Sequence, residues 1–408
     1  MATEAVATEG KSEKFEFTGK RGPFLRLILI NLLLTILTFG IYRFWAKTKV
    51  RKFIWSNIQF MDDPLEYTGK ATELLLGFLI VLAILFPLGL VYSAIDHLVP
   101  PDNTAMRIAL EVAYYLVLFA LIQIGFYRAW RYRMSRTTWR GIRLGLDGST
   151  WTFLKLSAGW TALTALTLGL AYPWMAIELW RYQITHTRIG ETAVSFRGSG
   201  RDLILTWLSV LAPVLIILLS NALHFYLLLE TVEVSPTQSA PNVNASPLAV
   251  FQIQAIPNWL VAVNLAALIV MVVAWFYYSV YVAQYQISSM YLDNASINSK
   301  LPIGRLFAYA ALALVVLAIP IVFLGYALFT GQGAGFISLF LSTIPALIFV
   351  FLIAPIAWTL IFTFELIKQL FITATVTNPA VLEDVVQSAK ASQKTGEGLA
   401  DALDIGGL

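Results

Sequence analysis

The sequence has no cysteine and little charge, and each of these absences excludes a class of protein. Without cysteine, the 408 residues can form no disulfide framework, no thiolate nucleophile and no cysteine metal site. Only 13% of the residues are charged, whereas soluble domains contain about 25%. Hydrophobic residues make up 58%, and aromatic side chains, which collect at membrane–water interfaces, are abundant. The composition therefore predicts a polytopic membrane protein.

The residue patterns that mark catalysis are also missing from the sequence. The three histidines, His97, His186 and His224, lie in different segments and fit no zinc-binding spacing. Neither a GxSxG nucleophile elbow nor a phosphate-binding loop is present. We therefore predict a protein that is not an enzyme and that has no catalytic residue, metal site or cofactor.

Long apolar runs occupy most of the chain. Eight of them reach or approach the length of about 20 residues that a membrane span needs. They cover residues 24–45, 74–95, 108–127, 152–178, 203–229, 259–282, 305–329 and 336–366. This pattern predicts an all-α polytopic membrane protein.

Basic residues are distributed unevenly among the connections between these runs. The connections after the first, third and fourth runs are rich in Arg and Lys, whereas 230–258 and 330–335 contain neither. Basic connections stay in the cytoplasm during membrane insertion. We therefore predict cytoplasmic termini, with residues 96–107, 230–258 and 330–335 on the outer side.

Two runs conflict with this rule, because 24–45 and 152–178 have basic residues on both sides. A single crossing cannot leave both ends in the cytoplasm. One interpretation is that each run enters the bilayer, turns and returns; the other is an ordinary span with a weakly obeyed charge bias. Gly40 and Gly169 would permit the turn, and the threonine two positions before each could hydrogen-bond the freed backbone.

The same two runs belong to a repeat with an offset of 129 residues. They end in TFGIYRFW (38–45) and TLGLAYPW (167–174), and the glycines that flank them are equally spaced from these motifs. Such registered identity indicates internal repetition. We assign a structural role to the residues that define the repeat, which are Gly19, Thr38, Gly40, Trp45, Gly69, Gly148, Thr167, Gly169, Trp174 and Gly198.

A shorter element recurs at 52–69, 131–148 and 181–198, with a weaker copy at 284–301. The first three copies begin with a basic residue and have a glycine 17 positions later. Two short alternating runs around turn residues are typical of a β-hairpin. The leading KFEFTG (14–19) resembles the last strand of such an element. We expect small cytoplasmic β-hairpins that pair into one sheet.

These patterns divide the chain into six parts. They are a cytoplasmic N-terminal segment with a short strand (1–23), a first membrane repeat unit (24–150), a second membrane repeat unit (151–229), an extracytoplasmic loop (230–258), a C-terminal membrane region with the decayed repeat (259–371) and a polar cytoplasmic tail (372–408).

Four features of the sequence resemble the YjgN-like bacterial inner-membrane proteins. They are FEFTG near the start, TFGIYRFWAKTKVRKF after the first apolar run, the strand-and-glycine tails, and EGLADALDIGGL at the end. The resemblance implies a multi-pass protein of the bacterial inner membrane. It carries over no catalytic or binding residue.

The basic clusters abut the apolar runs, where positive-inside bias alone would place them. Contact with anionic lipid headgroups is the second interpretation, and this position argues against a nucleic-acid partner. The candidate headgroup contacts are Arg43, Lys47, Lys52, Arg128, Arg131, Arg133, Arg136, Arg140 and Arg181.

Polar residues are sparse within the apolar runs. They are Glu111, Glu178, His224, Glu365, Asn31, Gln123, Asn221 and Asn264. These residues form no charge series of the kind that proton relays and voltage sensors use, so transport would depend on uncharged contacts. Two functions stay open: a transporter or channel-like protein, and a non-enzymatic scaffold that binds anionic lipids or a protein partner at the cytoplasmic face.

Overall fold

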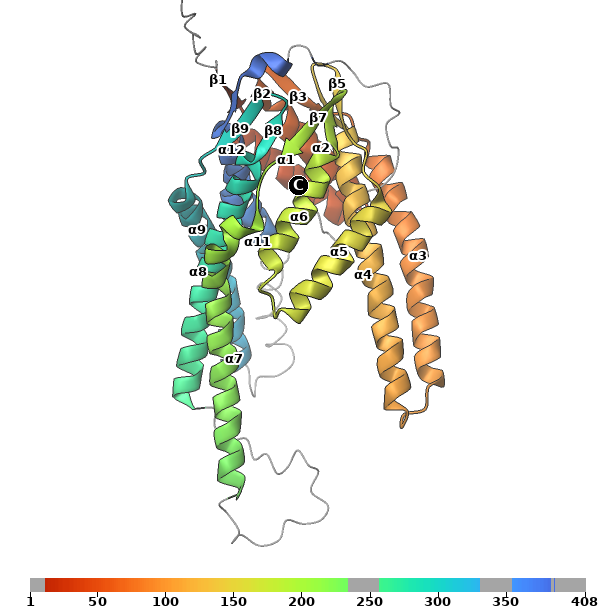
Figure 1. The fold of residues 1–408 in the computed structure, drawn as a ribbon, viewed down its shortest axis with the longest axis vertical. Coiled ribbons are helices and arrows are strands. Elements are labelled where there is room, and N and C mark those ends of the chain that lie inside the picture. Colours follow the sequence, from red (N-terminus) through yellow and green to blue (C-terminus); the bar gives the residue numbers. More distant parts are fainter. Residues whose placement is uncertain (1–11, 234–256, 331–353, 383–384, 386–408) are drawn as a thin grey trace, which may run out of the picture.

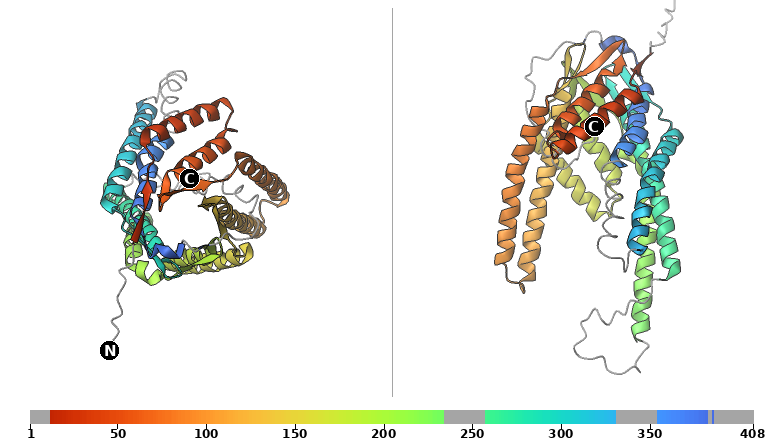
Figure 2. Two further views of the ribbon diagram at one scale, coloured as in Figure 1. Left: turned by 90° about the horizontal axis from the view of Figure 1, so that it is seen from above. Right: turned by 180° about the vertical axis from the view of Figure 1, so that it is seen from behind.

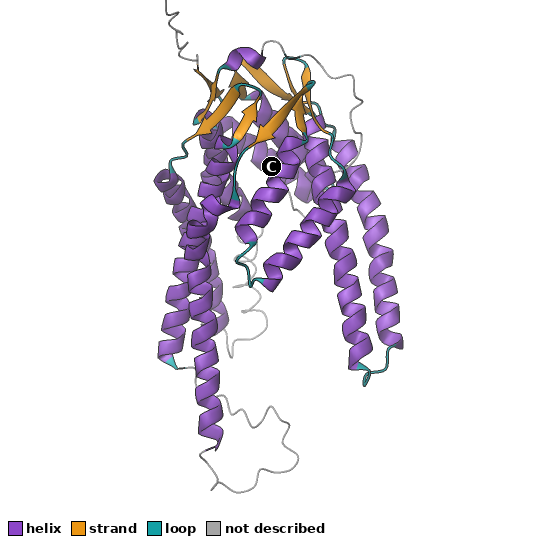
Figure 3. Ribbon diagram, viewed as in Figure 1, coloured by secondary structure: helices purple, strands orange, loops and turns teal. Residues whose placement is uncertain are grey.

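The structure is a computed structural model, and it describes residues 12–233, 257–330, 354–382 and 385. Strands gather at one end of the molecule, and helices extend from them toward the other end (Figures 1 and 3). The molecule therefore has a β part and an α part, although both are assembled from the whole length of the chain.

Ten strands of the described chain form a closed antiparallel ring, in which each strand pairs with its neighbours in sequence and β1 pairs with β10. Figure 2 shows this ring from above. The strands are β1 (Ser12–Phe17), β2 (Ile58–Phe60), β3 (Asp63–Tyr67), β4 (Thr137–Trp139), β5 (Ile142–Leu146), β6 (Thr187–Ile189), β7 (Thr192–Phe196), β8 (Met290–Leu292), β9 (Ala295–Ser299) and β10 (Ala374–Thr377). The predicted hairpins are all present, and they pair into one sheet as expected.

The helices run out from the ring and back in pairs. Two pairs are short: α1 (Arg21–Leu37) with α2 (Arg43–Ser56), and α5 (Thr150–Leu166) with α6 (Tyr172–Thr185). The longer helices are α3 (Ala71–Leu98), α4 (Thr104–Ser135), α7 (Ile204–Glu233), α8 (Asn258–Ser288) and α9 (Ile303–Thr330). The last returning segment consists of α11 (Ala354–Trp358), a π-helical turn η3 (Thr359–Thr363) and α12 (Phe364–Ile372). Two 3-10 turns, η1 (Gly200–Leu203) and η4 (Pro379–Leu382), complete the described chain.

Five segments of the described chain are long and apolar enough to cross a membrane. They are Ala71–Leu98, Thr104–Ser135, Gly200–Leu227, Asn258–Ser288 and Ala354–Ile372. Their outer surfaces are rich in exposed Leu, Ile, Val and Phe side chains, which suit a lipid environment. The prediction of a helical polytopic membrane protein is confirmed.

Each helix pair is flanked by two strands that pair with each other. The strands before α1 and after α2 align Phe15 with Phe60 and Phe17 with Ile58, and the same arrangement recurs around α5 and α6. Both ends of every pair therefore lie at the ring. The short pairs stop before the far ends of the long ones (Figures 1 and 2).

The apolar runs 24–45 and 152–178 are each split by a tight turn, as the first interpretation requires. Gly40 and Gly169 both have φ of +89°, and the residue before each has φ of +50°. In each turn the preceding threonine hydroxyl accepts a hydrogen bond from a backbone N–H four positions later, at 2.9 Å in the first turn and 3.1 Å in the second. The predicted turn is confirmed; that the pairs re-enter a bilayer stays a prediction.

The structure divides the chain differently from the six parts expected above. It has five units of strand, helix pair and strand, so the 129-residue offset relates the first unit to the third. Residues 24–150 contain most of the first unit and all of the second. The polar tail expected at 372–408 contains β10, whose Ala374 and Val376 are buried. A strand of only four residues cannot be recognised from the sequence, because so short an alternation of apolar and polar residues is not distinctive.

Of the three segments expected on the outer side, only one lies wholly within the described residues. Residues 96–107 contain the connection between α3 and α4, far from the ring (Figure 1). Most of the loop 230–258, and 331–335, lie outside the described residues.

Candidate functional site

The strand ring encloses an apolar chamber with a volume of about 300 Å³. Alternation along the strands produces it, because every second side chain points inward. In β7, for example, Val194 lines the chamber while Ala193 and Ser195 are exposed. The lining residues are Phe15, Trp55, Ile58, Phe60, Leu65, Met134, Thr137, Trp139, Leu144, Ile189, Val194, Leu292, Ala295, Ile297, Phe371, Val376 and Leu382.

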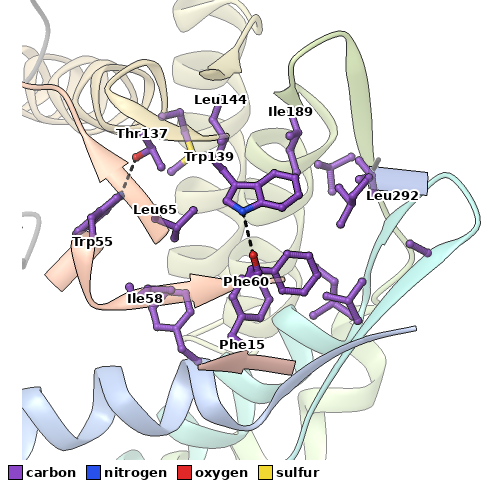
Figure 4. A pocket seen from close by; sticks show the side chains of 17 residues that line it. Phe15, Trp55, Ile58, Phe60, Leu65, Thr137, Trp139, Leu144, Ile189 and Leu292 are labelled. Carbon is purple, nitrogen blue, oxygen red and sulfur yellow. Dashed lines mark hydrogen bonds between the residues drawn. The ribbon is translucent and has the colours of Figure 1, made fainter. Parts of the chain in front are cut away.

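The few polar atoms of the chamber wall are bonded within the protein (Figure 4). The indole N–H of Trp139 donates to the carbonyl of Phe60 at 3.2 Å, and that of Trp55 donates to the Thr137 hydroxyl at 3.0 Å. This hydroxyl in turn donates to the carbonyl of Arg133 at 2.9 Å. The described wall therefore offers a ligand carbon surface and one methionine sulfur.

The two ends of the chamber are lined by different parts of the chain. Trp55, Met134 and Phe371 come from the last turns of α2, α4 and α12, so they face the helical part. At the opposite end, Leu382 of η4 and the nearby Val385 join the buried core of the ring. Figure 1 shows this short blue segment over the top of the strands. The short segment η4 thus covers this end of the chamber.

Four of the predicted structural glycines, Gly19, Gly69, Gly148 and Gly198, follow strands at points of close approach. A Cβ at Gly69 would lie 2.6 Å from the ring of Tyr67, and one at Gly148 would lie 2.3 Å from the Tyr127 hydroxyl. Corresponding distances at Gly19 and Gly198, to Phe17 and Phe196, are 2.7 and 2.5 Å. Space rather than backbone conformation requires glycine here, because none of the four has positive φ.

The spacing of 17 residues between a basic residue and a glycine has a structural cause. A guanidinium nitrogen of Arg181 donates to the Gly198 carbonyl at 2.6 Å, and Arg131 makes the same bond to Gly148. In the weaker copy, the polarity is reversed, and the Gln284 side chain accepts from the Leu301 N–H at 3.2 Å. The sequence reveals this spacing but not the bond.

Three more of the predicted headgroup contacts are buried or bonded to other residues of the chain. Arg136 donates to Glu73 at 2.7 Å, which joins the end of α4 to the start of α3. Arg140 pairs with Asp63 of the neighbouring hairpin, and Arg133 is only 9% exposed. The structure therefore favours internal roles for these arginines and for Arg131 and Arg181.

The remaining candidates lie at the surface or beside pockets. Lys52 and Arg128 are exposed, whereas Arg43 and Lys47 line a pocket beside the first turn. A headgroup role for these four stays a prediction.

The two motif tryptophans pack differently. Trp45 stacks on Tyr42 with ring centroids 6.2 Å apart. Trp174 lies against the backbone of Gly200, where a Cβ would come within 2.7 Å of the tryptophan Cα. The sequence singles out Trp174 but gives no sign of Gly200, which precedes α7.

Several polar groups within the helices bond to other side chains. Glu365 accepts from Arg21 at 2.9 Å and from Gln369 at 2.7 Å. Asn264 accepts from both Ser220 and Asn221, which joins α7 to α8.

His186 contacts the backbone of its own helix. Its Nδ1 lies 2.7 Å from the Tyr182 carbonyl. Among the described residues, no group of three or more His, Asp or Glu side chains could hold a metal ion.

Comparison with known proteins agrees with the resemblance. The family model described as "Bacterial protein of unknown function (DUF898)" matches residues 12–402. The chain is 30% identical over 133 residues to the inner membrane protein YjgN of Salmonella typhimurium strain LT2, a match that covers 33% of this chain and 31% of that protein. No solved structure matches. The chain therefore belongs to the DUF898 family, the YjgN-like inner-membrane proteins of bacteria.

Proposed function

We propose that this protein is a non-enzymatic lipid-binding protein, and that the chamber in its strand ring holds the hydrocarbon part of a lipid. The observation that carries the proposal is the carbon surface of the chamber, whose polar atoms are already bonded inside the protein. A polar solute would lose its hydration there without replacement, which is costly. A hydrocarbon chain gains about 0.8 kcal/mol for each buried methylene.

The size and position of the chamber support the same ligand class. A volume of about 300 Å³ lies at the lower end of the range for ligand pockets, about 300–1,000 Å³. Trp55, Met134 and Phe371 bring the ends of three helices to its wall. A chain leaving the bilayer along these helices would reach the chamber without crossing the ring.

Substitutions on one strand test this proposal. We expect Val194→Trp to fill the chamber and abolish labelling by a photoreactive fatty-acid analogue. Ala193→Trp is the matched control, because Ala193 is exposed on the same strand. Equal labelling of Val194→Trp and wild type in correctly folded protein would contradict the proposal.

The proposal places the ring and both termini in the cytoplasm, in agreement with the positive-inside rule. The absence of native cysteine allows clean labelling of single introduced cysteines. Ser56 is exposed near the ring, and Asp102 is exposed in the connection between α3 and α4. In intact cells, an impermeant thiol reagent should label Asp102→Cys but not Ser56→Cys. The reverse result would contradict this orientation.

Transport is the second candidate, and the two short helix pairs favour it. Membrane transporters commonly place broken helices around their binding sites, within repeated units. The turns at Gly40 and Gly169 break two such units in the same way. A polar solute would have to pass between the units rather than through the apolar ring. Solute flux into proteoliposomes, lost in Gly40→Val and Gly169→Val, would favour this candidate.

A further inference from the structure

A groove on the surface of the first short helix pair lies outside the ring chamber. Its described lining residues all belong to α1 and α2, and its volume is about 640 Å³. Figure 2 shows this pair in red, at the side of the molecule and close to the strands. Three cations, Arg26, Lys49 and Lys52, line the groove, and none of its described lining residues is acidic. The groove is therefore a positively charged surface.

The three cations are accessible, and each has donors available to a ligand. All three side chains are exposed. Lys49 donates to the Tyr42 hydroxyl, which leaves two of its three N–H groups. Neither Arg26 nor Lys52 makes an ion pair or a side-chain hydrogen bond within the part of the chain that the structure describes. The groove thus presents one guanidinium and two ammonium groups to its surroundings.

An apolar stripe continues from these cations toward the turn of the pair. It consists of Ile30, Leu33 and Leu37, which follow Arg26 at intervals of four, three and four residues and so lie on the same face of α1. The three side chains are between 44% and 64% exposed, and Phe39 in the turn itself is 97% exposed. One face of α1 therefore passes from charge near the ring to hydrocarbon near the turn. A phospholipid has the same order of headgroup and acyl chain.

The second short pair lacks this arrangement, although the repeat is in register. Glu178 corresponds to Lys49, and it pairs with Arg181, the counterpart of Lys52. Gly159 occupies the position of Ile30. The architecture that the two pairs share therefore requires neither the three cations nor the apolar stripe.

We propose that the groove binds one anionic membrane phospholipid, whose phosphate lies on Arg26, Lys49 and Lys52 and whose acyl chain follows the apolar stripe. A guanidinium group can bind two oxygens of a phosphate at once, and each ammonium group adds a compact charge. The apolar stripe then shields part of the acyl chain. Because this lipid is recognised by its charge, the site does not depend on the function proposed for the chamber.

Lipid binding to the purified full chain in detergent, followed by native mass spectrometry, tests the proposal. The probes are phosphatidylglycerol, phosphatidylcholine and glycerol 3-phosphate, titrated separately. We expect phosphatidylglycerol to bind more tightly than phosphatidylcholine, which has no net charge. Arg26→Gln/Lys52→Gln should weaken phosphatidylglycerol binding by at least about tenfold, because two contacts to the phosphate are lost. Glycerol 3-phosphate that binds as tightly as phosphatidylglycerol would overturn the assignment of a lipid.

The matched control removes two exposed charges elsewhere. Arg128→Gln/Lys155→Gln changes the net charge by the same amount, at exposed residues that do not line the groove. This variant should bind phosphatidylglycerol as the wild type does. A loss as large as that of Arg26→Gln/Lys52→Gln would mean general attraction to a basic surface and would refute the proposal.

Lys49→Glu gives the first pair the acidic residue of the second. The new carboxylate lies three residues before Lys52 and can pair with it, as Glu178 pairs with Arg181. Phosphatidylglycerol binding should weaken by at least about tenfold, whereas the thermal midpoint without lipid should stay close to that of the wild type, since the site is exposed. Unchanged binding would contradict a phosphate contact in the groove.

Ile30→Ser tests the acyl part of the site. It should weaken phosphatidylglycerol binding by about three- to fivefold, because apolar contact with the acyl chain is lost. Leu25→Ser is the control, since Leu25 is exposed on the same helix but does not line the groove. Equal affinities of Ile30→Ser and the wild type would remove the acyl chain from the groove and overturn the proposal.

Discussion

The two short helix pairs have the same turn but differ in the side chains around it. The first turn has a Thr35 carbonyl bonded to the Gly40 N–H at 2.8 Å, and the second has the same bond from Gly169 to Thr164 at 2.7 Å. At the positions that correspond to Asn31, Arg43 and Lys47, however, the α5–α6 pair has Trp160, Tyr172 and Ala176. The repeated turn is therefore architectural, whereas the polar side chains beside it are particular to α1–α2.

The aromatic side chains of the second pair make contacts in place of charges. Tyr172 stacks on Trp207 with ring centroids 4.4 Å apart, and the Trp207 indole donates to the Gly169 carbonyl at 2.9 Å. The second pair is thereby fixed to α7 by packing. Comparison of the two pairs separates the residues that build the turn from those that differ between the pairs.

The largest effect should come from the glycine that precedes each pair. Gly148→Val would drive a side chain into the fully buried Tyr127 hydroxyl and against His186, at 3.0 Å from an added Cβ. We expect a loss of about 3 kcal/mol in stability, at the upper end for overpacking. Gly19→Val meets mainly the ring of Phe17, which can move, so about 1 kcal/mol is expected. Thermal unfolding in detergent measures both, and equal losses would contradict this ranking.

The turn glycines should differ less from each other. Gly40→Ala and Gly169→Ala both place a side chain at φ of +89°, where L-residues are strained. Each should cost about 1–2 kcal/mol, the scale of a left-handed residue. A marked difference in thermal midpoint between the two variants would show that one turn is adaptable and would weaken the comparison.

Removal of the turn threonines should have a smaller effect. Thr38→Val and Thr167→Val leave the backbone N–H of Tyr42 and of Ala171 without its acceptor. A lost hydrogen bond costs about 1 kcal/mol. Thr→Ser at the same positions keeps the hydroxyl and is the control. Thermal midpoints of the Ser variants as low as those of the Val variants would assign the loss to packing instead.

Local features of the fold could be predicted from the sequence, because each leaves a short pattern. Glycine and threonine at fixed positions indicate the two turns, and alternating runs around turn residues indicate the hairpins. The closed ring leaves no such pattern. Its last strand has four residues, Ala374–Thr377, and pairs with residues more than 350 positions earlier, for instance Thr377 with Ser12.

The roles of the arginines were harder to predict than their positions. Arg131, Arg136 and Arg140 share one basic stretch with Arg128, and composition alone does not distinguish them. Each of the three bonds to a residue that the fold brings near, such as Glu73, which lies 63 positions before Arg136. The apolar chamber cannot be predicted from the sequence for a similar reason. Its inward side chains come from ten strands and meet only when the ring closes.

Ring closure also has a consequence for synthesis. Residues 12–17 leave the ribosome early, but β1 needs β10, from residues 374–377, to complete its pairing. Throughout translation the growing sheet has two open edges, and open edges invite pairing with other chains. The helix pairs can insert one after another during this time, because each pair is contiguous in the sequence. The last strand and Leu382 then close the ring, so the chamber cannot form before residues 374–382 have been made.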